Sequence, residues 1–161
     1  MTRITILLLL FLPFSFLQAQ NKETEKLNIL MNEWHLAATN TDADVFFGFM
    51  NSDCIYIGTD AKERWTKDEF VQFAKPYFDK GKAWDFKPIE REFYFSKNKK
   101  TAWFNETLNT WMGVCRSSGV LEKIAGNWKL KHYHLSVTVP NEKIKGFIEL
   151  VKKQDNPPHQ E

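Results

Sequence analysis

The sequence predicts an α+β fold: a cone-shaped, curved mixed or antiparallel sheet with three N-terminal helices over its concave face. Apolar residues recur at helical spacing in the first half of the chain, whereas after Trp84 they alternate with polar residues in long segments. Helices followed by strands are typical of folds in which helices pack on one face of an antiparallel sheet. Long strands twist and curl, so such a sheet encloses an interior beneath the helices.

The length and composition indicate one domain with a sizeable core. The chain has 161 residues, and its 14 Phe, 6 Trp and 4 Tyr supply apolar bulk for a core and for the lining of a cavity. The 22 basic and 20 acidic residues are interspersed and give a net charge of +2. We therefore expect no nucleic-acid partner and no electrostatic binding to an anionic membrane surface.

Residues 1–19 have the pattern of a secretory signal peptide. Arg3 provides a short positive region, an apolar run follows it, and Leu17-Gln-Ala19 fits a small-residue cleavage site. The run is short and is interrupted by Pro13, which favours a cleaved signal over an uncleaved anchor. We expect a mature chain from residue 20 that is secreted or periplasmic and has no membrane segment.

Export would place Cys54 and Cys115 in an oxidising compartment, where one disulfide could join them. The sequence does not show that the two residues come within reach of each other. We favour two separate thiols and leave the pairing open. Neither cysteine lies in a local pattern typical of a catalytic nucleophile.

The domain is predicted over residues 20–140 and begins with helices. The first spans Glu23–Thr39 because its apolar residues form one stripe. Thr41 caps the second helix, with Asp44 three residues later as in a capping box. A second capping box, Thr66-Lys-Asp-Glu69, begins the third helix.

One proline and one glycine are predicted to affect the third helix. A small hairpin is predicted before it. Pro76 should kink or split the helix, and Gly81 should end it as a left-handed cap. Before the helix, Cys54–Gly58 and Glu63–Trp65 read as the two strands of a small hairpin.

Four long strands complete the domain, and a C-terminal region follows over residues 141–161. We expect an amphipathic helix over Glu142–Lys153 and a disordered tail from Gln154. The four strands are predicted at Trp84–Ser96, Thr101–Met112, Arg116–Ile124 and Trp128–Val139.

The last strand carries the strongest candidates for chemistry. Trp128, Leu130, His132, His134 and Ser136 are two apart, so they are predicted to share one face that is apolar at one end and polar at the other. A polar end on a core-facing strand is typical of a pocket wall. We predict that the two histidines act there as a general base or proton relay, the alternative being a hydrogen-bonded pair in a polar core.

A two-residue turn at Gly126-Asn127 would pair Leu121 with His132 and Gly119 with His134. A glycine beside a histidine leaves space for a ligand. Two histidines could also ligate zinc, but zinc needs a third ligand, for which Glu106 is a candidate. We expect no metal and no cofactor.

The opposite face of the same strands has no helix left to cover it. Val120, Tyr133, Leu135 and Val137 would form its apolar part. An uncovered apolar face favours association, so we predict a homodimer through the convex face of the sheet. The alternative is that the C-terminal helix folds back over this face.

The order of elements resembles the nuclear transport factor 2-like superfamily, in which a curved sheet and three helices surround a pocket. Tyr56-Ile-Gly-Thr-Asp60 followed by Trp65-Thr66, and Arg116-Ser-Ser-Gly-Val120 leading to Trp128-Lys-Leu-Lys-His-Tyr-His-Leu-Ser136, resemble the SnoaL-like domain family. The resemblance covers about residues 25–140. It implies the fold more specifically than the activity, because the superfamily includes isomerases, cyclases, dehydratases and partner-binding modules.

The resemblance also implies a site at the open end of the cone. Glu106 and Arg116 would form a partly buried pair there, or Arg116 would bind a ligand carboxylate, although strict alternation turns Arg116 away from His132. The residues implied to line the site are Tyr56, Trp65, Trp103, Glu106, Arg116, His132 and His134.

Two functional hypotheses follow. In the first, an exported protein binds a small, partly apolar molecule in the cone, where the histidines could perform acid–base chemistry of an isomerase, cyclase or dehydratase type. In the second, aromatic side chains fill the cone and the protein is a non-catalytic ligand-binding or dimeric interaction module. An open pocket that reaches both histidines would favour the first, and a packed interior the second.

Overall fold

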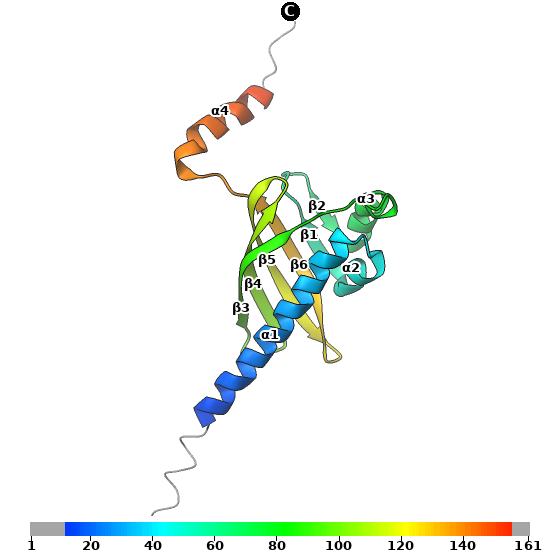
Figure 1. Ribbon diagram of the computed structural model, residues 1–161, viewed down its shortest axis with the longest axis vertical. Coiled ribbons are helices and arrows are strands. Elements are labelled where there is room, and N and C mark those ends of the chain that lie inside the picture. The colour runs from blue at the N-terminus through cyan, green and yellow to red at the C-terminus, as the bar shows by residue number, and fades with distance from the viewer. Residues whose placement is uncertain (1–11, 156–161) are drawn as a thin grey trace, which may run out of the picture.

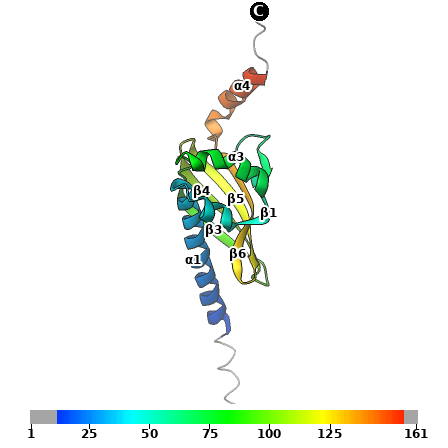
Figure 2. The same cartoon turned by 90° about the vertical axis from the view of Figure 1, so that its right-hand side faces the viewer.

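The structure is a computed structural model that describes residues 12–155, with side chains described from Lys22 to Lys152. Residues 1–11 of the predicted signal peptide and residues 156–161 of the predicted tail lie outside the described residues. A curved sheet carries three helices on its concave side, and a fourth helix extends beyond the sheet (Figures 1 and 2). The predicted α+β fold with a curved mixed sheet is confirmed.

Six strands form one mixed sheet. The strands are β1 (Met50–Ile57), β2 (Arg64–Thr66), β3 (Lys87–Phe95), β4 (Thr101–Thr110), β5 (Gly113–Ile124) and β6 (Asn127–Val137). Their order across the sheet is β2-β1-β6-β5-β4-β3. β1 and β6 pair in parallel, and all the other neighbours are antiparallel. Irregular pairings in β1, β3 and the β5–β6 ladder help to bend the sheet into a half-cone.

Three helices cover the concave face. α1 (Leu12–Thr39) begins well before the predicted Glu23 and runs through the predicted cleavage position. α2 (Ala43–Phe49) is capped by Asp42, whose side chain accepts a hydrogen bond from Val45, and not by Thr41 as predicted. Thr41 instead has a positive φ of 56°, which turns the chain between the two helices.

α3 (Lys67–Asp79) begins at the predicted capping box of Thr66 and Glu69. Pro76 lies inside this helix without splitting it, and Gly81 follows with a φ of 66°, as expected for a left-handed cap. No helix within residues 12–155 is both long enough and apolar enough to cross a membrane.

The C-terminal region extends away from the sheet (Figure 1). A short 3-10 turn over Asn141–Lys143 leads into α4 (Ile144–Asp155), which begins and ends two residues later than predicted. All its described side chains are exposed. α4 therefore leaves the convex face of the sheet uncovered, and the alternative that it folds back over that face is wrong.

The β5–β6 hairpin turns one residue earlier than predicted. Ala125 and Gly126 occupy the turn with φ angles of 48° and 84°, as a type I′ turn requires at both of its central positions. The predicted turn at Gly126-Asn127 is therefore wrong, and so are the predicted pairs Leu121–His132 and Gly119–His134.

A bulge then shifts the pairing of these two strands. Leu121 lies opposite Leu130, but the preceding residue, Val120, lies opposite His132, so Lys131 is an extra residue in β6. The side chains of a strand alternate with a period of two, so one extra residue reverses the side on which all later side chains lie.

The bulge decides which side chains of β6 enter the core. Trp128 and Leu130 are buried before it, and Tyr133 and Leu135 are buried after it. Tyr133 packs edge-on against Trp34 of α1, with ring centroids 4.9 Å apart. The single face predicted from Trp128 to Ser136 therefore does not exist in the folded protein.

A buried carboxylate lies at the centre of the concave face. Glu106 of β4 has no solvent-exposed surface, and its Oε2 accepts a hydrogen bond of 2.7 Å from Arg91 Nε. Its Oε1 accepts hydrogen bonds from the Ser117 hydroxyl at 2.8 Å and the Tyr133 hydroxyl at 3.3 Å. His35 Nε2 lies 3.0 Å from the same oxygen. We call these five residues the Glu106 cluster.

The cluster keeps Glu106 ionised. Burial raises the pKa of this carboxyl group, but the hydrogen bond and charge of His35, the charge of Arg91 and the hydrogen bond of Ser117 lower it by more. The net result is a pKa of about 2. A buried charge is tolerated only when it is paired and hydrogen-bonded, and here donors surround both oxygens.

The cluster also holds α1 against the sheet. Arg91 Nη1 donates to the side-chain oxygens of Asn28 and Asn32 at 3.3 and 3.0 Å. Through His35 and these two asparagines, α1 contacts the same charged group that joins β3, β4, β5 and β6.

We predict that Glu106→Gln destabilises the protein by about 3–5 kcal/mol, because it leaves the buried Arg91 guanidinium without a countercharge. Urea denaturation would measure the change in the free energy of unfolding. Glu90→Gln is the matched control: Glu90 lies on the exposed side of β3, and its loss should change stability by about 0.5 kcal/mol or less. Equal effects of the two substitutions would contradict a central role for the cluster.

Stability should also fall in acid because of Glu106. Its folded-state pKa lies below the ordinary value of 4.5, so its stabilising contribution is present above about pH 4.5. The contribution is lost as the pH falls from 4.5 towards 2. Urea denaturation at pH 6, 4.5 and 3 should show this decline for the wild type and a shallower one for Glu106→Gln. Parallel curves for the two proteins would argue against this origin.

Candidate functional site

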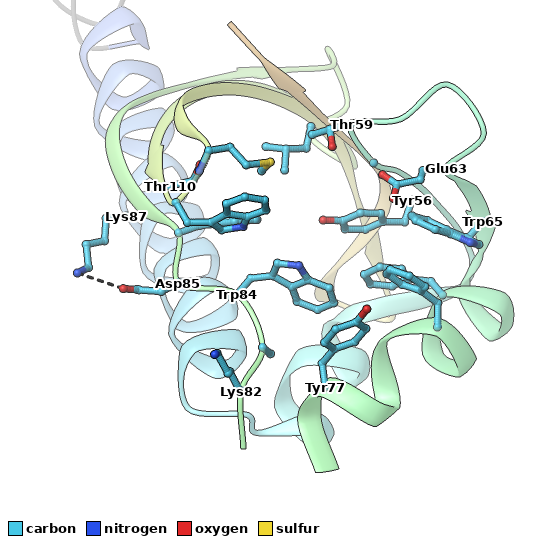
Figure 3. Close-up of a pocket in the computed structure, with 18 of the residues that line it drawn as sticks. Tyr56, Thr59, Glu63, Trp65, Tyr77, Lys82, Trp84, Asp85, Lys87 and Thr110 are labelled. Atoms are coloured by element: carbon cyan, nitrogen blue, oxygen red, sulfur yellow. Dashed lines mark hydrogen bonds and ion pairs between the residues drawn. The ribbon is translucent and has the colours of Figure 1, made fainter. Parts of the chain in front are cut away.

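A pocket of about 870 Å³ opens at the end of the cone where β1 turns towards β2 and β4 turns into β5. Its walls come from these two turns, α3 and the segment 82–87 (Figure 3). The lining residues are Tyr56, Gly58, Thr59, Glu63, Trp65, Phe70, Phe73, Tyr77, Lys82, Ala83, Trp84, Asp85, Phe86, Lys87, Asn109, Thr110, Trp111, Met112 and Leu135.

Aromatic rings make up one wall. The rings of Tyr56 and Phe70 stack with centroids 3.9 Å apart, and those of Trp65 and Phe73 stack at 4.6 Å. Tyr56 and Trp65 are direct cross-strand partners of β1 and β2, so the hairpin places them side by side. Phe70 and Phe73 are three residues apart on α3, so the helix turns both towards the hairpin.

The opposite wall carries further aromatic residues that the sequence did not mark as site residues. Trp84 follows α3 and lies 6.1 Å from the Tyr77 ring, and Trp111 stands in the β4–β5 turn with 82% of its surface exposed. For α3, the helical spacing of Phe70, Phe73 and Tyr77 was the sequence pattern that could have identified these residues as part of the pocket wall. Trp84 and Trp111 were predicted to lie in strands, but β3 begins only at Lys87 and β4 ends at Thr110, so both residues lie outside the sheet.

The Tyr56 hydroxyl is available to a ligand. Figure 3 shows it pointing into the middle of the pocket, and within the described residues it makes no hydrogen bond to the protein. Burial, and then the nearby charges of Glu63 and Glu106, raise the pKa of Tyr56 well above its ordinary value. The hydroxyl therefore stays protonated at neutral pH and can donate a hydrogen bond.

Glu106 lies inside the cone but is not among the residues that line the pocket. Tyr133, which donates to Glu106, packs against Tyr56 with ring centroids 5.3 Å apart. Phe86 of the pocket wall meets His35 edge-on at 6.4 Å. The Glu106 cluster is therefore beneath the pocket floor, and its donors are already engaged with the carboxylate.

His132 and His134 lie on the other side of the sheet. They pair with Ile55 and Ile57 of β1, whereas Tyr56 between them pairs with Tyr133 and faces the core. The prediction that both histidines face the pocket is wrong, because it assumed strict alternation through the bulge at Lys131. Burial against the sheet, and then the charges of His134 and Arg64, lower the pKa of His132.

Trp103 and Arg116 are also on the convex face, so their predicted place in the pocket is wrong: each lies between two buried residues of its strand, and successive side chains point to opposite faces. Trp103 is 47% exposed and stacks on Tyr94, with ring centroids 6.0 Å apart. Arg116 is exposed and lies opposite Thr107 and Ser136. It forms no pair with Glu106, because Arg91 takes that place.

The convex apolar patch also differs from the prediction. Tyr133 and Leu135 are buried in the core, whereas Val120 is half-buried and Val137 is exposed. Around Val120 the convex face carries Trp103 and His132 instead.

The described residues contain no group of three His, Cys, Asp or Glu side chains that could hold a metal ion. Glu106 and the two histidines are on opposite faces, so they cannot share one. Cys54 and Cys115 are buried free thiols. Burial raises the pKa of the Cys54 thiol to about 12, which makes it a poor nucleophile.

Comparisons with known proteins agree with this architecture. The SnoaL-like domain family matches residues 27–140. A search of functionally curated proteins found no similar sequence.

Solved structures share the fold at low sequence identity. A nuclear transport factor 2-like protein of unknown function from Pseudomonas putida KT2440 is 11% identical, with a TM-score of 0.63 over 76% of this chain and 92% of its own. A "putative dehydratase" of the same family from Streptomyces avermitilis is 11% identical, with a TM-score of 0.64 over 75% and 99%. A "putative ketosteroid isomerase" from Parabacteroides distasonis ATCC 8503 is 18% identical, with a TM-score of 0.59 over 73% and 89%.

Identities this low carry the fold and not the activity. The sequence match covers most of the described chain, and the curved sheet, its three covering helices and the pocket at the open end are the features found in the structure. The protein belongs to the SnoaL-like domain family and shares its fold with these nuclear transport factor 2-like structures.

Proposed function

We propose that this protein is exported and binds a small, partly apolar molecule in the aromatic pocket at the open end of the cone. The observation that carries the proposal is the pocket itself: its volume is about 870 Å³, within the range of small-molecule sites, and eight of its 19 lining residues are aromatic. The Tyr56 hydroxyl supplies a polar group that could orient a ligand within these apolar walls.

Binding is better supported than histidine-based catalysis. The two histidines that could move protons lie across the sheet from the pocket, and the buried carboxylate of Glu106 is fully engaged. An interior filled by aromatic side chains, which was the alternative hypothesis, is at odds with the open volume. The putative enzyme names of two structural relatives offer only an analogy for this chain.

The proposal predicts that Trp111→Ala and Tyr77→Ala each weaken the binding of a neutral apolar dye, N-phenyl-1-naphthylamine, by about tenfold. Each removes an aromatic contact from the pocket wall. Both side chains are substantially exposed, so the free energy of unfolding should change little. Fluorescence titration would measure the affinity, and mass spectrometry of natively purified protein would search for a bound small molecule.

Three substitutions on the convex face serve as controls. Trp103→Ala removes an exposed tryptophan of comparable size, and His132→Ala and His134→Ala remove the histidines predicted from the sequence. All three should leave the dye affinity within about twofold of wild type. A wild-type protein that does not bind the dye, or a loss of binding only in these controls, would overturn the proposed pocket.

The convex face supports a second proposal, that the protein forms a homodimer through it. Trp103 and Tyr94 are 47% and 43% exposed and lie side by side. Residues that pair across neighbouring strands form a row that crosses the whole sheet, from Arg64 on β2 through His134 on β6 to Glu92 on β3. If two copies pack with their convex faces together about a two-fold axis parallel to the strands, the order of the strands is reversed between them. Arg64 of one copy would then lie opposite Glu92 of the other.

The neighbouring row would also be complementary. It runs from Ile55 on β1 through His132 and Val120 to Trp103 on β4. The same axis would bring Ile55 against Trp103 of the second copy. Apolar contact at the centre and opposite charges at the edges are features that a stable dimer interface combines.

Light scattering should therefore give a dimer mass for the wild type at about 50 µM, a concentration at which a dimer with micromolar affinity is mostly associated. Trp103→Glu should give a monomer, because it places a charge in the apolar centre of the interface. Trp111→Glu, which changes an even more exposed tryptophan at the pocket mouth, should stay dimeric. A monomeric wild type, or a dimeric Trp103→Glu, would refute this interface.

A further inference from the structure

The charged groups around the pocket differ in where they point. Glu63, Lys82, Asp85 and Lys87 all contribute to the lining. Figure 3 shows Lys82, Asp85 and Lys87 directed away from the aromatic rings, on the outer side of the segment 82–87. Asp85 and Lys87 also pair with each other at 3.2 Å, and both are mostly exposed. Glu63 differs, because its carboxylate lies beside Tyr56 on the inner wall.

The Glu63 carboxylate is held in place by the β1–β2 turn. Its Oε2 accepts a hydrogen bond of 3.1 Å from the backbone N–H of Asp60, and its own backbone carbonyl accepts one of 2.8 Å from Gly58. Within the described residues, Oε1 of Glu63 has no hydrogen-bond partner. One oxygen therefore positions the carboxylate and the other is available to a ligand.

Gly58 makes room for this arrangement. A Cβ at position 58 would lie 2.2 Å from Glu63 Oε2, a distance at which the carboxylate would have to move. The absence of a side chain at Gly58 is thus what allows the Glu63 side chain to fold over the turn and reach the pocket wall. Asp60 and Glu63 belong to a tight turn, so this position is set locally.

The aromatic walls complement a positive charge as well as an apolar body. The faces of tryptophan and tyrosine rings attract cations through their quadrupoles. Trp65, Trp84 and Trp111 all line the pocket that contains the Glu63 carboxylate. An anionic ligand would instead meet this carboxylate, while the two lysines of the rim point outwards.

From these observations we infer that the ligand of the pocket is an organic cation: an aromatic or alkyl body that carries an ammonium group, with Glu63 Oε1 accepting a hydrogen bond from the ammonium. The aromatic walls enclose the body, and the Tyr56 hydroxyl is placed to donate to a polar substituent. This inference rests on the proposed function, because it names the class of molecule that the same pocket binds.

Three probes of similar shape test the charge preference. They are 2-phenylethylamine, which is cationic at pH 7, neutral 2-phenylethanol and anionic 3-phenylpropanoate. Isothermal titration calorimetry on the wild type should show the amine binding about tenfold more tightly than the alcohol, because a charge-assisted hydrogen bond is roughly twice as strong as a neutral one. The carboxylate probe should bind more weakly than the alcohol.

Variants assign the preference to Glu63. Glu63→Gln keeps an acceptor for the Asp60 N–H but removes the charge, so amine and alcohol should bind within about threefold of each other. Gly58→Ala should reduce the preference as well, because it displaces the carboxylate. Asp85→Asn is the matched control and should keep the full preference, since Asp85 points away and is paired with Lys87. Alcohol affinity should stay within about twofold of wild type in Glu63→Gln and Asp85→Asn, which shows that the pocket is intact.

The outcomes separate this inference from the proposed function. Equal binding of amine and alcohol to the wild type, tighter binding of the carboxylate probe, or an amine preference that survives Glu63→Gln would overturn the cation inference and leave the apolar pocket standing. Loss of the preference in Asp85→Asn alone would also overturn it. Failure of all three probes and of the neutral dye would overturn both the inference and the proposed pocket.

Discussion

The ionised carboxylate of Glu106 is the constraint on which the interior of this protein depends. A fully buried charge must be surrounded by donors, and the donors come from α1, β3, β5 and β6. Each of these elements is therefore held at a set distance from β4. The cluster occupies the deep part of the cone, so the open volume lies above it, at the wide end where the turns and α3 meet.

The bulge at Lys131 determines which chemistry each face of the sheet presents. Before it, β6 buries Trp128 and Leu130, and after it the strand buries Tyr133 and Leu135. The reversal gives Glu106 its tyrosine donor and gives the pocket an apolar side chain from β6. It also moves His132 and His134 to the convex face. That one inserted residue thus decides which side chains in the second half of β6 are buried and which are on the convex face.

The pocket combines a preformed apolar wall with few polar groups, which is the usual design of small-molecule sites. Two of its polar groups come from one short segment: Tyr56 at the end of β1 and Glu63 in the turn that follows. Both are positioned by local backbone geometry, and Gly58 lies between them. The recognition chemistry is thus concentrated in the β1–β2 hairpin, while α3 and the segment 82–87 supply shape.

Much of this architecture could be predicted from the sequence, because it depends on local patterns. The capping box of Thr66 and Glu69, the left-handed Gly81 and the alternation in β3 to β6 each report the conformation of their own segment. The place of Tyr56 and Trp65 on the inner hairpin also follows from alternation. These features were enough to predict the fold class and to identify the family resemblance.

Only the tertiary structure decided the partners of Glu106, the face of the histidines and the inward position of Glu63. His35 is 71 residues from Glu106 in sequence and meets it only when α1 docks on the sheet, whereas Arg91 is the direct cross-strand partner of Glu106 in the β3–β4 hairpin. The bulge at Lys131 has no local signature, because a residue is left unpaired only relative to the neighbouring strand. A strand has a side-chain period of two, so that single unpaired residue exchanged the two faces of β6 and moved His132 and His134 away from the pocket.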